Sequence, residues 1–109
     1  MAYDEELAAR IRTSLEGHPG VTERKMFGGI GFMIHGNMCC GVVSDDLMVR
    51  VGPDSHEASL ALAHARPMDF TGRPMKGFVF VGPGGINDDG ALSGWIDQGV
   101  TFAQSLPKK

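Results

Sequence analysis

One histidine and two adjacent cysteines are the residues of this chain whose types and spacing most readily suggest chemistry. His35, Cys39 and Cys40 lie within the stretch IHGNMCC. A thiolate is a nucleophile and a metal ligand, and a neighbouring imidazole can act as its base. A structural zinc ion takes four ligands, however, and this stretch offers two on one face. We therefore expect no metal and no cofactor, and keep a thiol- or metal-dependent small-molecule activity around Cys40 and His35 as a second alternative.

Basic residues in two stretches offer a different chemistry, the binding of nucleic acid. Lysine and arginine side chains neutralise backbone phosphates when they gather on one surface. The formal net charge of −3 gives no general attraction to a polyanion, so binding would need a local patch. The residues that would form this patch are Arg24, Lys25, Arg73 and Lys76. Charged residues also protect sheet edges from aggregation, which is the competing interpretation.

The stretch KGFVFV, residues 76–81, matches the start of an RNA-recognition signature in which strand aromatics stack on bases. The match fails at Val79, where glycine or alanine is expected, and at Pro83, where an aromatic residue is expected. We therefore expect Phe78 and Phe80 to face the helices as part of the core.

Hydrophobic periodicity predicts the elements that must position these residues. The expected helices span 3–16, 54–66 and 89–106, and the expected strands span 24–27, 30–35, 38–43, 47–51 and 78–81. Hairpins between successive strands imply antiparallel pairing. The order α-β-β-β-β-α-β-α predicts an α+β fold, a two-layer sandwich of a mainly antiparallel sheet of about five strands with three helices on one face. Residues 1–109 are expected to form a single domain.

The turn of the central hairpin decides which side chains the sheet buries. Gly36-Asn37 fits a type II′ turn, which needs glycine at its first central position. The residues that would then share the core face are Ile30, Phe32, Ile34, Cys39 and Val43. Those that would share the opposite face are Met33, His35, Met38, Cys40 and Val42. This register predicts a buried Cys39 and a more accessible Cys40.

The face away from the helices carries an unusual number of methionines. Its apolar side chains are Met33, Met38, Met48 and Val42. Methionine is over-used at adaptable binding surfaces, and a small protein rarely exposes so large an apolar patch. We expect a homodimer through this face or an adjoining edge strand, since two-fold dimers are the commonest soluble assembly. An unknown protein partner would cover the same patch.

The composition is that of a globular protein. Hydrophobic residues make up 42% and charged residues 21% of the 109 residues, close to the usual values. No apolar run approaches the ~20 residues of a membrane-spanning helix. The N-terminus, MAYDEELAAR, is acidic and lacks the basic and apolar segments of a secretory signal. We expect a cytoplasmic protein that does not enter a membrane.

Four stretches together resemble the TfoX N-terminal domain family. They are ERKMFGGIGFM, LMVRVG, KGFVFV and LSGWIDQGVTFAQSLPKK, and they extend over nearly the whole chain. The family's Lys-x-Phe-Gly-Gly turn is matched by Lys25, Phe27, Gly28 and Gly29. Its tryptophan-bearing terminal helix, which ends near Leu-Pro, is matched by Trp95, Ala103, Leu106 and Pro107.

The resemblance implies a small α+β domain of the kind found at the front of regulators of natural competence and related transcription. Those regulators carry a helical C-terminal domain, whereas this chain ends at Lys109, so we expect a stand-alone N-domain. The resemblance supplies no catalytic residues. We expect a non-enzymatic interaction module with a regulatory role through protein partners, and keep a nucleic-acid-binding regulator as the first alternative.

Overall fold

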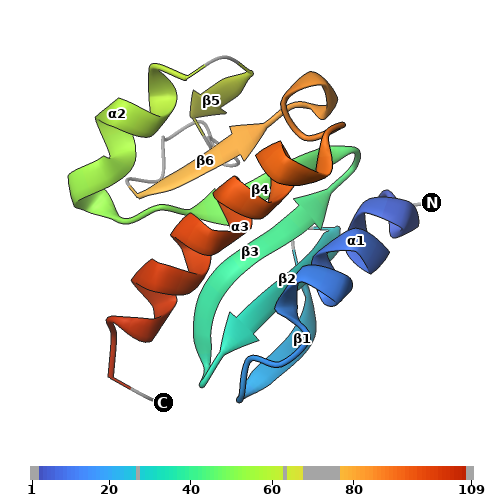
Figure 1. The fold of residues 1–109 in the computed structure, drawn as a ribbon, viewed down its shortest axis with the longest axis vertical. Coiled ribbons are helices and arrows are strands. Elements are labelled where there is room, and N and C mark those ends of the chain that lie inside the picture. The colour runs from blue at the N-terminus through green and yellow to red at the C-terminus, as the bar shows by residue number, and fades with distance from the viewer. Residues whose placement is uncertain (1–2, 27, 63, 68–76, 108–109) are drawn as a thin grey trace.

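The computed structural model describes residues 3–26, 28–62, 64–67 and 77–107 (Figure 1). Its elements in chain order are α1 (Glu5–Leu15), β1 (Val21–Met26), β2 (Gly29–Ile34), β3 (Asn37–Val43), β4 (Asp46–Arg50), η1 (Pro53–Ser55), α2 (His56–Leu60), β5 (Ala65–Pro67), β6 (Phe78–Val81), η2 (Pro83–Gly85) and α3 (Asp89–Gln104). In this part of the chain, six strands form one antiparallel sheet in the order β1-β2-β3-β4-β6-β5. The strands β1 and β5 are therefore its edges.

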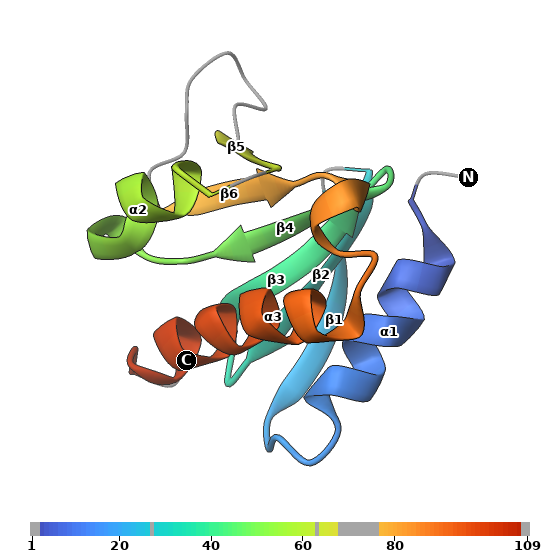
Figure 2. The same cartoon turned by 45° about the horizontal axis from the view of Figure 1, so that its top comes forward.

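The helices α1 and α3 lie across one face of the sheet, which we call the inner face (Figure 1 and Figure 2). Leu60 of α2 packs against the same core. The side-chain amide of Gln98 in α3 also donates a 3.0 Å hydrogen bond to Ser59 Oγ in α2. The predicted α+β fold is confirmed, with six strands in place of about five. We call the opposite side of the sheet the outer face.

The additional strand is β5, which the sequence pattern assigned to the end of a helix. The helix α2 ends at Leu60, and His64 has a φ of +69°, a left-handed conformation that does not continue a helix. The chain from Ala65 to Pro67 then pairs with β6. Proline cannot donate a hydrogen bond to a sheet, so it is tolerated here because β5 is an edge strand.

Both long helices begin at aspartate caps, and both bury an apolar stripe. Asp4 Oδ1 accepts hydrogen bonds from the Glu6 and Leu7 amides, and Asp88 Oδ2 accepts one from the Ala91 amide. The buried residues of α1 are Leu7, Ala8, Ile11 and Leu15, and those of α3 are Leu92, Trp95, Ile96, Gly99, Val100 and Ala103. No helix in the described chain is both long enough and apolar enough to cross a membrane.

The turn of the central hairpin lies one residue earlier than the sequence pattern suggests. The strand β2 ends at Ile34 and β3 begins at Asn37, so His35 and Gly36 are the two central residues. Both have positive φ, +52° and +84°, as a type I′ turn requires. The predicted type II′ turn at Gly36-Asn37 is therefore wrong.

The strand β3 also carries one residue more than the stretch of β2 beside it. Met33 pairs with Met38 and Phe32 pairs with Cys40, which leaves Cys39 as the additional residue of a β-bulge. The bulge shifts the alternation of side chains by one residue. Cys40 therefore joins the main core, whereas Met38 packs on the outer face.

This shift corrects three of the predicted positions. Cys40 and Val42 are fully buried in the main core, although the sequence pattern placed both on the face opposite to it. Val43, expected in the core, packs instead against the outer-face cluster around Met48 and Phe80. The period of two is correct on each side of the bulge and wrong across it.

Gly99 brings α3 into contact with the bulge. A Cβ atom at Gly99 would lie 2.6 Å from the carbonyl oxygen of Cys39 and 3.3 Å from its Sγ atom. Real Cβ atoms do not approach a backbone oxygen so closely, so only glycine allows this helix–sheet distance. The close packing of α3 against β3 thus explains why the buried stripe of α3 contains a glycine.

Replacing Gly99 with alanine should destabilise the protein by about 1–3 kcal/mol, because the new methyl group would push α3 away from the bulge. Helix propensity alone predicts the opposite sign, a gain of about 1 kcal/mol. Gly94 in the same helix is the matched control, because a Cβ atom there meets nothing within 4 Å. Gly94→Ala should therefore stabilise by about 0.5–1 kcal/mol in urea unfolding. A Gly99→Ala protein as stable as the wild type would show that α3 lies farther from β3.

The two cysteines should be unreactive in the folded protein. A hydrogen bond with the Cys39 thiol, together with complete burial, raises the pKa of the Cys40 thiol well above its usual range. Since the thiolate is the reacting species, a chromogenic disulfide reagent at pH 8 should label neither cysteine until urea is added. Rapid labelling of Cys40 alone in the native state would contradict this result and would indicate a hairpin without the bulge.

Candidate functional site

The outer face of the sheet carries a second, smaller apolar cluster. Met48 and Phe80 are buried there, with Met38, Val43 and Phe78 packed against them. The residues that alternate with them in β4 and β6 belong to the main core: Leu47, Val49, Val79 and Val81. The expectation that Phe78 and Phe80 face the helices is therefore wrong, because β6 presents its valines to the helices and its phenylalanines to the outer face.

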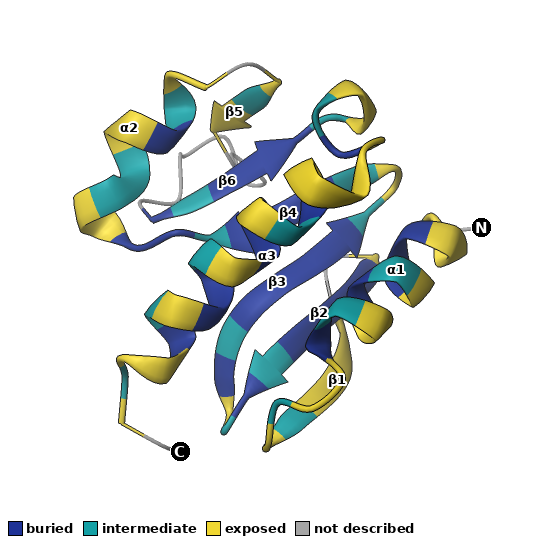
Figure 3. Cartoon of the chain, in the orientation of Figure 1, coloured by how far each residue is buried: buried dark blue, intermediate teal, exposed yellow. Residues whose placement is uncertain are grey.

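A groove of about 600 Å³ lies beside this cluster. Its lining comes from β1 to β4 and from the turn between β2 and β3: Thr22, Glu23, Arg24, Met33, Gly36, Met38 and Arg50. At one end is the edge strand β1, most of whose side chains are exposed (Figure 3). Near the middle, Met33 and Met38 are half-buried and directly opposite each other. The groove therefore crosses the strands instead of following one of them.

Arg50, at the end of β4, is held by two aromatic rings. Its guanidinium carbon lies 5.5 Å from the ring centre of Phe78 and 5.2 Å from that of Phe102 in α3. Both distances lie within the usual range of a cation–π contact. These two contacts orient the Arg50 side chain. Its guanidinium group forms no ion pair with a carboxylate of the described chain.

The described arginines fall into two groups. Three have carboxylate partners: Arg10 with Asp89 at 3.0 Å, Arg12 with Glu23 at 2.8 Å, and Arg66 with Asp46. Arg24 and Arg50 have none among the described residues. Both of these unpaired arginines line the outer-face groove. The groove thus carries two positive charges that the described part of the chain does not neutralise.

The carboxylate of the groove is already engaged. Arg12 donates to both oxygens of Glu23, through Nε at 2.8 Å and Nη2 at 2.9 Å. This pair lowers the pKa of the Glu23 carboxyl group and raises the pKa of Arg12. Glu23 therefore stays ionised at neutral pH, and its charge is balanced by Arg12 and not by the groove.

The structure separates the members of the predicted basic patch. Arg24 pairs with Gly31 and lines the groove, whereas Lys25 pairs with Ile30 of the main core and belongs to the inner side of β1. Arg73 and Lys76 lie outside the described residues. The structure instead places Arg24 and Arg50 along the same groove, and the sequence prediction missed Arg50. The alternation in LMVRV could have identified Arg50 as an outer-face residue.

The predicted methionine interface is only partly accessible. Met33 and Met38 line the groove, but Met48 has no exposed surface and Val42 lies in the main core. Leu62 lies two residues after the end of α2 and is 53% exposed. It is the one large hydrophobic side chain that the described chain leaves exposed. The accessible apolar surface of the outer face is therefore smaller than the sequence suggests.

The predicted pair of His35 and Cys40 does not form an accessible site. Cys40 is fully buried, whereas His35 is a half-buried turn residue whose ring lies against Gly20. A Cβ atom at Gly20 would be 2.3 Å from His35 Nδ1. Across the residues that the structure describes, no three histidine, cysteine or acidic side chains gather as metal ligands.

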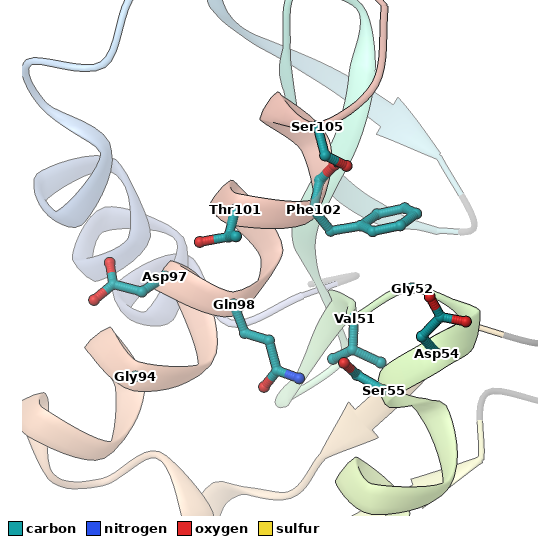
Figure 4. Close-up of a pocket in the computed structure, with 10 residues that line it drawn as sticks. All are labelled: Val51, Gly52, Asp54, Ser55, Gly94, Asp97, Gln98, Thr101, Phe102 and Ser105. Atoms are coloured by element: carbon teal, nitrogen blue, oxygen red, sulfur yellow. The ribbon is translucent and has the colours of Figure 1, made fainter.

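A second cavity, of about 490 Å³, lies between α3 and residues 51–55 (Figure 4). Gln98 and Phe102 point toward that segment, whereas Asp97 and Thr101 point away from it. The Phe102 ring packs on Gly52, and the Gln98 amide is bonded to Ser59. The inward-facing groups of this cavity thus already serve the packing of α3.

The Lys-x-Phe-Gly-Gly turn between β1 and β2 has a clear backbone role. Gly28 has a φ of +75°, which favours glycine. A Cβ atom at Gly29 would lie 1.9 Å from the carbonyl oxygen of Val42, so this position also needs glycine. Trp95 is buried in the main core, while Phe27 lies outside the described residues. These residues maintain the fold.

The comparisons with known proteins agree with this turn and this terminal helix. A family model described as the TfoX N-terminal domain matches residues 13–103. No curated protein and no solved structure matches the chain. Because the family model extends over most of the 109 residues, the chain belongs to the TfoX N-terminal domain family.

Proposed function

We propose that this chain is a non-enzymatic regulatory module that acts in the cytoplasm by binding a protein partner at its outer-face groove. Membership of the TfoX N-terminal domain family suggests a competence-related regulatory domain. The observation that carries the proposal is the placement of both unpaired arginines, Arg24 and Arg50, at a groove that also contains Met33 and Met38. Arginine and methionine are both enriched at protein interfaces.

The lining of the groove favours binding over catalysis. Arginine stays protonated in proteins, and a thioether is no acid or base. Glu23, the carboxylate of the groove, accepts hydrogen bonds from Nε and Nη2 of Arg12 and has a lowered pKa, whereas a general base works best with a pKa near the operating pH. The groove therefore offers charge and adaptable apolar contact.

Self-association through the outer face stays a prediction, but the accessible apolar surface that motivated it is smaller than expected. That expectation was based on four apolar side chains, of which Val42 and Met48 are buried. Two copies joined at this face would also bring four unpaired arginine side chains into one interface, and like charges repel. A different, complementary partner fits the groove better. The nucleic-acid alternative retains Arg24 but not Lys25 on this face.

Replacing Met33 with aspartate should abolish partner binding, because it puts a charge in the middle of the groove. The measurement is affinity capture from nuclease-treated native extract of the source organism, with the tagged full chain as bait. The partner recovered by the wild type should be lost with Met33→Asp. Leu62→Asp is the matched control, because Leu62 is more exposed than Met33 and does not line the groove.

Thermal melting of both variants shows whether each is folded. Equal recovery of the partner by Met33→Asp and the wild type would contradict binding at the groove. A partner that the wild type recovers from untreated extract but not from nuclease-treated extract would favour the nucleic-acid alternative.

A further inference from the structure

We propose that the outer-face groove binds an extended acidic protein segment, with two carboxylates four residues apart and an apolar side chain midway between them. This inference deepens the proposed function and rests on it. It follows from the spacing of the two unpaired arginines, the position of the two methionines, and the chemistry of both residue types.

The spacing of the arginines comes from the sheet. Arg24 is in β1 and Arg50 is in β4, and the order β1-β2-β3-β4 puts two strands between them. Neighbouring strands lie about 4.8 Å apart, so three spacings separate β1 and β4 by about 14 Å. The register puts Arg24 in line with Gly31, Gly41 and Met48, and Met48 is two residues from Arg50, so the two arginine backbones are about 16 Å apart. An extended chain rises about 3.3 Å per residue, so four residues span about 13 Å, and the long side chains of arginine and glutamate can cover the difference. Residues i and i+4 of such a chain also point to the same side.

The two arginines suit carboxylates at these two positions. A planar guanidinium binds a carboxylate through two parallel hydrogen bonds. Arg50 is already oriented by its contacts with Phe78 and Phe102, so it loses little freedom on binding. Arg24 is exposed, and its side chain makes no hydrogen bond, ion pair or ring contact in the described chain, so its guanidinium is available.

The methionines define the middle of the segment. Met33 and Met38 pair across β2 and β3, which are the two strands between β1 and β4. In an extended segment that crosses the groove, the side chain at i+2 points to the same side as those at i and i+4. An apolar residue at i+2 would contact both thioethers, whose flexible side chains adapt to different shapes.

A protein segment fits this face better than single-stranded nucleic acid. Sequence-tolerant binding of single strands uses exposed aromatic rings on which bases stack. Here the guanidinium of Arg50 lies over Phe78, and that of Arg66 lies 5.2 Å from the ring centre of Phe80. Phe80 is also only 8% exposed. The described aromatic rings of the outer face are thus covered by arginines.

The test is a titration of the ¹⁵N-labelled full chain with the peptide acetyl-Ser-Glu-Ser-Leu-Ser-Glu-Ser-amide, followed by NMR. Saturable shifts are expected at the amides of Thr22, Met33, Met38 and Arg50. A peptide of the same composition with its two glutamates adjacent should bind at least about threefold more weakly, because it can reach one arginine at a time. A peptide with glutamine in place of both glutamates should give no saturable shift.

Variants locate the contacts. Arg24→Gln and Arg50→Gln should each weaken binding by about three- to fivefold, the range of an exposed ion pair. Arg10→Gln is the matched control and should bind like the wild type, because Arg10 pairs with Asp89 and does not line the groove. Arg50→Gln removes two ring contacts and is checked by thermal melting. Arg24→Gln removes no described contact, so it tests the proposal even if the other variant unfolds.

Four results would overturn the proposal: no saturable shift, equal binding of the adjacent-glutamate peptide, unchanged affinity in Arg24→Gln, or tighter binding of a thymidine oligonucleotide at the same amides. Shifts of these amides on dilution of the free protein would also overturn it, in favour of a second copy as the occupant. If the peptide fails while partner capture still depends on Met33, the proposed function stands and only the acidic-segment inference falls.

Discussion

The contact between Gly99 of α3 and the backbone of Cys39 is the constraint on which the rest of this structure depends. It joins the last helix to the sheet at the point where β3 carries its additional residue. Glycine is required there because any Cβ atom would meet a carbonyl oxygen that cannot move without distorting the strand. Cys40 and Val42, which the bulge turns toward the inner face, belong to the same main core as the buried residues of α3. The bulge and the helix therefore stabilise each other.

The outer-face groove is a consequence of the same bulge. With strict alternation, Met38 would share a face with Cys40, and the groove would lose half of its apolar floor. The additional residue instead sends Cys40 into the main core and leaves Met38 opposite Met33 on the outer face. The arginines at the two ends of the groove come from strands of ordinary alternation. A local irregularity in one strand thus prepares a surface that extends over four.

The sequence predicted the fold class, the two long helices and most strands, because each is encoded by a local period and a local cap. Asp4, Asp88 and the buried stripe of α3 are examples. The sequence did not predict the hairpin turn or the bulge, because glycine at position 36 fits two turn types, and a bulge is selected by packing against α3. The errors at Cys40, Val42 and Val43 all follow from this. Arg24 was predicted as a basic site residue, whereas its relation to Arg50 depends on strand order, which no local pattern contains.

The exposure of the methionine methyl groups is the sharpest measure of the bulge at Cys39, since it reports both the register of β3 and the existence of the groove. The full chain labelled with ¹³C at its methionine methyl groups can be mixed with a soluble paramagnetic agent, and each resonance assigned by single methionine substitutions. We expect strong relaxation for Met33 and Met38 and weak relaxation for Met48, which has no exposed surface. A protected Met38 beside an exposed Met48 would contradict the bulge at Cys39 and, with it, the groove on the outer face.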